Sequence, residues 1–171
     1  MSWVSFDIPT QNKHQRTIMD NTAQSTGLRS ILDLLVDSRE SYMELCNRVD
    51  DTRTKDFLNA LSWERIALET ALMAEVRRMG PASPQHKEQG AAERPAAWKE
   101  VRAALSNANG AQVLPACERG EGYLLMRYDE VLQGDEFDIT TRTVLTLQRA
   151  QVHGNLNNAR SRTKRAVLAG I

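Results

Sequence analysis

Four stretches of the chain place apolar side chains alternately three and four residues apart, and this spacing constrains the fold more than any other feature. Because an α-helix turns once in 3.6 residues, side chains at this spacing line one face of a helix. The second stretch ends at Gly80-Pro81, where a glycine stop precedes a residue that cannot continue a helix. Its face consists of Phe57, Leu61, Glu64, Leu68, Leu72, Val76 and Met79.

The other three stretches predict three more long amphipathic helices. The first begins at Leu28, ends near Asp50, and has a face of Leu28, Ile31, Leu35, Ser38, Tyr42, Leu45 and Val49. The third has a face of Leu114, Cys117, Glu121, Leu124, Tyr128 and Val131. The fourth runs from about Ile139 to Ala166 and has the most polar face, with Leu145, Gln148, Gln151, Val152, Asn155, Leu156, Ala159 and Thr163.

The connections between these helices predict the fold class. Tight links join the first helix to the second and the third to the fourth, so each pair forms an antiparallel hairpin. A long crossover joins the second helix to the third; it contains a linker, 80–96, and a short amphipathic helix whose Trp98 is expected to hold the crossover against the rest. Four helices with one long crossover indicate an all-α, ferritin-like four-helix bundle. The alternative is an up-down bundle with a long loop in the middle.

We divide the chain into residues 1–26, an N-terminal arm or disordered tail, and residues 27–168, the bundle. The first segment is polar and aperiodic apart from a brief apolar run at its beginning.

Composition excludes several classes of function. Lys and Arg together number 22, as do Asp and Glu, so the formal charge is zero, which argues against nucleic-acid binding. The basic run Arg160, Arg162, Lys164 and Arg165 leaves that possibility open only at the C-terminal end.

No apolar stretch is long enough for a membrane span or arranged like a signal peptide. The two cysteines are typical of a protein in a reducing compartment. We therefore expect a cytoplasmic protein.

Polar residues at inward-facing positions predict a buried polar network in the middle of the bundle. Glu64 lies between Leu61 and Leu68, and Glu121 lies between Cys117 and Leu124. Buried carboxylates without a cation should have raised pKa values and share protons with their neighbours. Such a layer can fix the register of the helices. The predicted members are Ser38, Glu64, Glu121, Gln148 and Gln151.

The alternative interpretation of these acids is a metal site for iron or another divalent metal, with Glu64, Glu118 and Glu121 as ligands. A di-iron bundle takes a Glu from each of two helices and a Glu-x-x-His pair from each of the others. Ala67 stands where the second helix would need its histidine, and Gln148 and Gln151 are neutral amides. All three histidines lie outside the predicted inward faces. We therefore expect no metal and no cofactor.

Residues 117–123, CERGEGY, which contain the CERGE motif, resemble the third-helix signature of a family of bacterial ferritin-like four-helix-bundle proteins catalogued as a domain of unknown function. Residues 39–42, 64–65, 97–105 and 128–132 resemble the same family. The resemblance covers roughly residues 28–160. It implies a ferritin-like fold and a bacterial source, and it brings no established activity.

The sequence favours a non-catalytic role over an enzymatic one. Cys46 and Cys117 share no helix face with a histidine, so neither resembles an activated nucleophile. We expect a homo-oligomer that acts through protein contacts. Trp63 and Trp98 are expected to be amphipathic anchors, and the alternative is an exposed tryptophan at a subunit interface. The second hypothesis is a metal-binding, oxidase-type relative of ferritin.

Overall fold

A computed structural model describes the backbone of residues 10–80, 95–134 and 137–170, and side chains from Gln24 onward within these ranges. All regular structure in the described residues is helical, so the predicted all-α class is confirmed. The elements are α1 (Thr10–Arg48), α2 (Thr52–Arg78), α3 (Ala96–Asn107), the 3₁₀ turn η2 (Gly110–Gln112), α4 (Val113–Gly134) and α5 (Ile139–Ala169).

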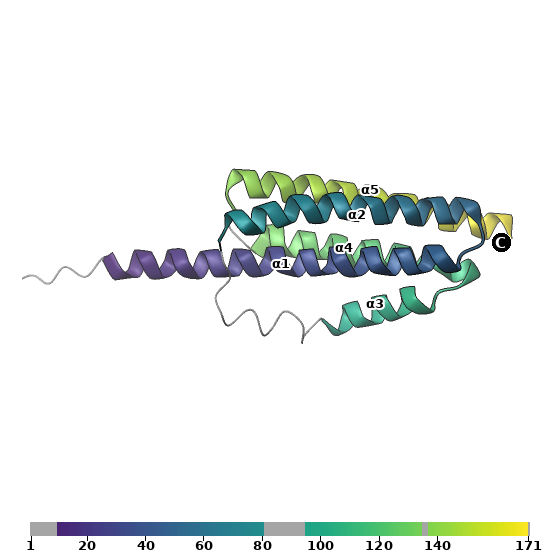
Figure 1. Ribbon diagram of the computed structural model, residues 1–171, viewed down its shortest axis with the longest axis horizontal. Helices are drawn as coiled ribbons and strands as arrows, with labels where there is room; N and C mark the ends of the chain where they lie inside the picture. The colour runs from purple at the N-terminus through teal and green to yellow at the C-terminus, as the bar shows by residue number, and fades with distance from the viewer. Residues whose placement is uncertain (1–9, 81–94, 135–136, 171) are drawn as a thin grey trace, which may run out of the picture.

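Four long helices lie side by side, and the short helix α3 lies outside them (Figure 1). Helix α1 packs mainly on α2, and α4 packs mainly on α5; the two pairs meet where α1 contacts α4 and α2 contacts α5. Helices α1 and α5 run toward the end of the molecule that holds the C-terminus, whereas α2 and α4 run away from it (Figure 1). Helix α3 packs along α1 and α4.

Helix α1 begins at Thr10, well before the start that we predicted near Leu28. Residues 10–26, which we assigned to an arm or a disordered tail, therefore continue the helix, and α1 projects beyond its neighbours (Figure 1). The helix starts earlier than predicted because the prediction required an apolar stripe, whereas a segment without proline or glycine can extend an existing helix by propensity alone. Residues 1–9 lie outside the described part, and the division of the chain at residue 27 stays a prediction.

Aspartates begin α2 and α5. The Asp51 carboxylate accepts a hydrogen bond from the Thr54 backbone N–H at 2.7 Å, and Asp138 accepts one from Thr141 at 2.8 Å. These bonds satisfy amide groups that have no partner within the helix, and they help to lower the pKa of both carboxyl groups. In the sequence, each aspartate stands just before a periodic stretch.

The stripes predicted from the sequence meet in the interior and form two apolar clusters. One cluster gathers Leu28, Leu35, Leu72, Trp98, Tyr128 and Leu145. The other, nearer the α1–α2 connection, gathers Tyr42, Leu58, Leu61, Leu105, Val113 and Cys117. Among the described residues, no helix combines the length and the apolar character needed to cross a membrane.

Trp98 anchors α3 to the four long helices, as we predicted. Its side chain is fully buried, and the indole Nε1–H donates to Asp37 Oδ2 of α1 at 2.9 Å. Its ring lies 5.4 Å from the ring of Tyr123 of α4, measured between centroids. The crossover is therefore fixed to α1 by a charge-assisted hydrogen bond and to α4 by aromatic packing.

We predict that Trp98→Phe lowers the free energy of unfolding by about 2 kcal/mol, because it removes a hydrogen bond to a buried carboxylate while keeping most of the ring. Urea unfolding followed by circular dichroism measures this loss. The control is Leu147→Ala on the surface of α5, where the side chain is 66% exposed; it should change stability by less than about 0.5 kcal/mol. Equal effects of the two substitutions would contradict the anchoring role.

Candidate functional site

A buried ion pair joins α2 to α4 in the interior of the molecule. The Arg65 guanidinium donates from Nη2 to Glu121 Oε1, and both side chains have no exposed surface. Moving two charges out of water costs several kcal/mol per ion, so such a pair persists only with good geometry and further hydrogen bonds. The surroundings of Arg65 and Glu121 supply these bonds.

Four other side chains complete the cluster around this pair. Arg65 Nε donates to Ser38 Oγ of α1 at 3.1 Å, and Nη1 lies 3.4 Å from Glu64 Oε1. The Tyr42 hydroxyl of α1 donates to Glu121 Oε1 at 2.5 Å. Glu64 in turn accepts a hydrogen bond from Asn155 Nδ2 of α5. The cluster thus ties all four long helices together in one network, which we call the arginine cluster: Ser38, Tyr42, Glu64, Arg65, Glu121 and Asn155.

Burial and nearby charges set the protonation states of Arg65, Tyr42 and the adjacent Cys117. Burial by itself would lower the pKa of Arg65, but the Glu121 carboxylate and Tyr42 raise it above its ordinary value. Burial and the Glu121 charge raise the pKa of Tyr42 well above its usual range. The same two causes raise the pKa of the Cys117 thiol. Arg65 is therefore charged, and Tyr42 and Cys117 are protonated, across the physiological pH range.

Three of the five predicted network residues lie together in the structure. Ser38, Glu64 and Glu121 all contact Arg65. Gln148 is buried but forms a separate group, in which it accepts from the Tyr128 hydroxyl at 2.8 Å and donates to the Leu68 carbonyl at 3.0 Å. Gln151 is exposed on α5, so its predicted place in the interior is wrong.

Sequence reasoning missed the cation of the cluster. We expected buried acids without a positive partner, yet Arg65 lies four residues after Leu61 and three before Leu68, which is the spacing of an inward position. The signal was therefore present. Glu64, three residues after Leu61 and four before Leu68, fits the same inward spacing, so spacing alone does not choose between the two residues. Tyr42 was placed correctly on the inward face, but its partner was not predicted.

The glutamates of the alternative metal hypothesis do not converge on a common point that could hold an ion. Glu121 binds Arg65, and Glu64 binds Arg65 and Asn155. Glu118 lies at the surface and forms an ion pair with Arg160 at 3.1 Å. Within residues 24–80, 95–134 and 137–170, no group of three or more His, Cys, Asp or Glu side chains is arranged to hold a metal. The donor set does not fit iron, because a guanidinium already neutralises the inward acid.

The cluster lacks the arrangement that acid–base or nucleophilic catalysis requires. Cys117 and Tyr42 are protonated and fully buried, so neither presents a reactive anion to a substrate. His153 lies exposed on α5, away from these groups. What the arrangement can do is hold helices in one register, since a slip of one turn would separate the charges.

Residues 23–134 match the model of a protein family described as a domain of unknown function, DUF2383. This range covers α2, α3, α4 and most of α1, and it contains Tyr42, Arg65 and Glu121. The chain belongs to this family. No curated protein and no solved structure matches the chain.

We predict that Arg65→Leu and Glu121→Leu each destabilise this family member by about 3–5 kcal/mol, because each leaves the other charge buried without its partner. The double variant should be destabilised less than either single variant, because no unpaired charge remains. Urea unfolding of all four proteins measures the coupling.

The exposed pair Glu118–Arg160 provides the control for this cycle, since its side chains are 33% and 51% exposed. Its coupling energy should be below about 1 kcal/mol. If the losses of unfolding free energy caused by Arg65→Leu and Glu121→Leu simply add in the double variant, the two side chains do not act as a pair.

Gly120 provides a second test of the cluster's geometry. A Cβ atom at this position would lie 3.1 Å from the Tyr42 hydroxyl oxygen, whereas one at Gly122 would lie 4.0 Å from its nearest neighbour, Leu156 Cδ1. In a helix interior Ala is favoured over Gly by about 0.5–1 kcal/mol. Gly122→Ala should therefore stabilise the protein, and Gly120→Ala should destabilise it by displacing the Tyr42 hydroxyl from Glu121. Thermal unfolding compares the two, and an equal stabilisation would contradict the predicted contact.

Proposed function

We propose that the protein is a ferritin-like four-helix bundle of bacterial, cytoplasmic origin that is not catalytic and acts by associating with itself. The fold assignment is supported by helix direction. Helices α2 and α4 run the same way, so the chain must return along the molecule between them, and α3 forms part of that return (Figure 1). A long crossover between two hairpins is the arrangement of ferritin-like bundles.

The interior supports a structural role for the helices. Enzymes of this architecture place inward-facing carboxylates and histidines around metal ions. Here a guanidinium occupies the inward face of α2, and Glu121 Oε1 accepts hydrogen bonds from Arg65 and Tyr42. The polar interior is therefore used to hold the helices together, and we assign the function to the surface.

The surface carries one apolar face that suits a protein contact. Trp63, Ile66 and Met73 lie on α2 at spacings that place them along one side of the helix, and Met43 is exposed on the adjacent α1. Trp63 is 71% exposed, which is the observation that carries this proposal. Aromatic and methionine side chains are enriched at protein interfaces, and tryptophan is frequent among residues that dominate binding energy. We call Trp63, Ile66 and Met73 the Trp63 face.

A second copy of this chain is the partner that we propose for the Trp63 face. The chain has 22 basic and 22 acidic residues and no net charge, so two copies do not repel each other through a long-range field. Homo-oligomers with two-fold symmetry bury the same patch on both subunits, and an apolar patch is complementary to itself.

The test replaces Trp63 and Ile66 together by serine and measures molar mass by light scattering during size exclusion at several concentrations. We expect the unaltered protein to form an oligomer and this variant to be monomeric with unchanged helicity. The control replaces Ile139 and Leu147 of α5, which are 79% and 66% exposed, by serine. The control should keep the oligomer. A monomeric parent protein, or an oligomer that survives the loss of Trp63 and Ile66, would contradict the proposal.

A further inference from the structure

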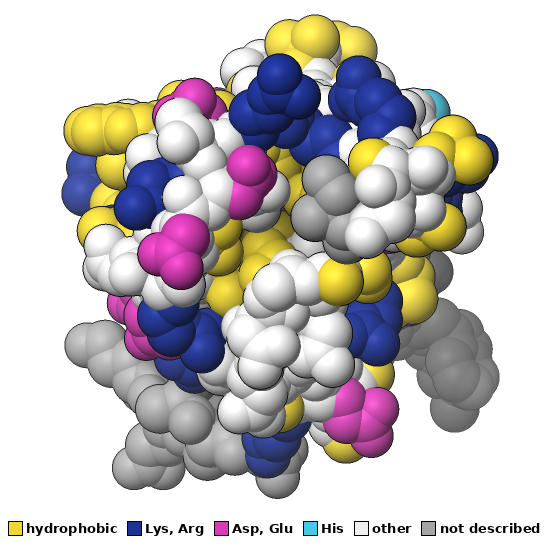
Figure 2. All heavy atoms as spheres, turned by 90° about the vertical axis from the view of Figure 1, so that its right-hand side faces the viewer, with side chains coloured by type: hydrophobic (Ala, Val, Ile, Leu, Met, Phe, Trp, Pro, Cys, Tyr) yellow, Lys and Arg dark blue, Asp and Glu magenta, His cyan; other side chains and the backbone are white. Residues whose placement is uncertain are grey.

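A hollow opens at the end of the molecule where α1 passes into α2 and where α5 ends (Figure 2). Its walls come from four separate parts of the chain: the α1–α2 connection, the first turn of α2, the start of α4 with η2, and the last turns of α5. Its volume of about 860 Å³ falls within the range of small-molecule sites. We call it the end pocket. None of its lining residues belongs to the Trp63 face.

The floor of the end pocket is apolar. Val49, Leu114 and Ala166 line it together with small residues from the same elements, and Figure 2 shows hydrophobic side chains at the centre of the hollow. An apolar floor accommodates a hydrocarbon group, because burial against it removes apolar surface from water.

Arginines form part of the rim of the end pocket. Arg48, Arg53, Arg162 and Arg165 all line the pocket. Arg162 is held in place by its position over the Phe57 ring, 4.6 Å from the centroid, and by a hydrogen bond to Asn158 Oδ1 at 3.0 Å. Among the described residues, neither Arg162 nor Arg165 has a carboxylate within ion-pair distance. Arg162 is therefore oriented, and both arginines are available to an anion.

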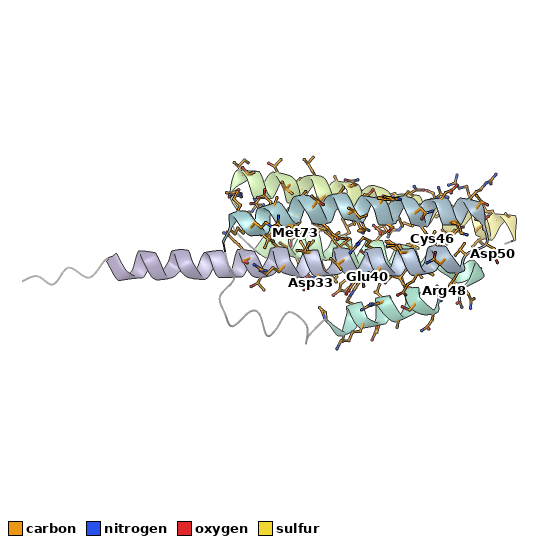
Figure 3. The ribbon with its side chains drawn as sticks, in the orientation of Figure 1. Asp33, Glu40, Cys46, Arg48, Asp50 and Met73 are labelled. Atoms are coloured by element: carbon orange, nitrogen blue, oxygen red, sulfur yellow. The ribbon has the colours of Figure 1, made fainter. Side chains whose placement is uncertain are left out.

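Three aspartates of the α1–α2 side also line the pocket: Asp50, Asp51 and Asp56. Asp51 is already used as the cap of α2. Figure 2 shows basic side chains gathered on one rim of the hollow and acidic side chains on another, and Figure 3 shows Arg48 and Asp50 toward this end of α1. The pocket is thus polarised, and we expect an anion on the α5 side, where Arg162 and Arg165 lie.

The amino-terminal end of α4 adds to the positive side. Gly110 and Ala111 line the pocket, and Asn109 provides no side-chain cap at the start of η2. The helix dipole therefore places partial positive charge at the pocket. It complements the arginines, which remain the main source of attraction.

We propose that the end pocket binds a small amphipathic acid, with an apolar chain on the floor and a carboxylate or phosphate head against Arg162 and Arg165. The apolar floor excludes a bare ion as the preferred ligand, and the aspartates disfavour a ligand with acidic groups at both ends. The site needs no metal and no contact through the Trp63 face.

Titration of the ¹⁵N-labelled full-length protein with octanoate, octyl phosphate, octylamine and inorganic phosphate tests this site. Octanoate and octyl phosphate should shift the amide signals of residues 48–56, 110–114 and 162–169, and the stronger of the two identifies the preferred head group. Octylamine and inorganic phosphate should bind at least tenfold more weakly, because each lacks one of the two required features.

Substitutions locate the head group. Arg165→Gln should weaken binding of the acids about fivefold or more, by removing one ionic contact worth about 1 kcal/mol. The matched control, Lys164→Gln, removes the same charge from a neighbouring exposed residue that does not line the pocket, and it should leave affinity unchanged. Ala166→Phe, which fills the floor, should abolish binding while the helical circular dichroism signal stays the same.

Three results would overturn the proposal: no shifts in these segments at millimolar octanoate and octyl phosphate, equal binding of octylamine, or equal losses from Arg165→Gln and Lys164→Gln. The last result would show that the acids respond to overall charge and not to the end pocket. Oligomer formation through the Trp63 face is measured separately, so failure of one proposal is distinguishable from failure of the other.

Discussion

The ion pair between Arg65 and Glu121 constrains the register in which the helices of this molecule pack. It joins α2 to α4 without any exposed surface, and Ser38 and Tyr42 bring α1 into the same network. Apolar stripes can slide along one another at modest cost, whereas a buried charge has one acceptable partner position. The two apolar clusters stabilise the fold by burying hydrophobic side chains away from water. The ion pair determines which of the compatible registers is adopted.

This choice of interior has a consequence for function. An inward acid in a helical bundle can be neutralised by a metal, by a proton or by a basic side chain, and each choice permits different chemistry. Here a guanidinium binds Glu121, and the nearby thiol and phenol remain protonated. We therefore propose a structural role for the interior and assign interactions with other molecules to the surface. The Trp63 face and the end pocket are the two surface features that offer them.

Helical periodicity predicted most of the fold, because burial of a stripe depends on many residues together and tolerates errors at single positions. It predicted less of the site, because one helix face does not show which side chain of another helix will meet it. Arg65 and Glu64 both fit the inward spacing of α2, and only the approach of Glu121 decides in favour of Arg65. The predicted place of Gln151 was wrong for a related reason. The buried face of α5 consists of residues such as Leu145, Gln148, Val152 and Leu156, and Gln151 lies outside it.

High-resolution diffraction with anomalous scattering at the iron and manganese edges tests the central claim most directly, because it shows both the position of Arg65 and any bound transition metal. The protein should be purified without chelators and crystallised with both metals available. The account predicts the Arg65 guanidinium in contact with Glu121 and no anomalous peak between Glu64 and Glu121. A metal peak at that point, with Arg65 turned away from Glu121, would contradict it.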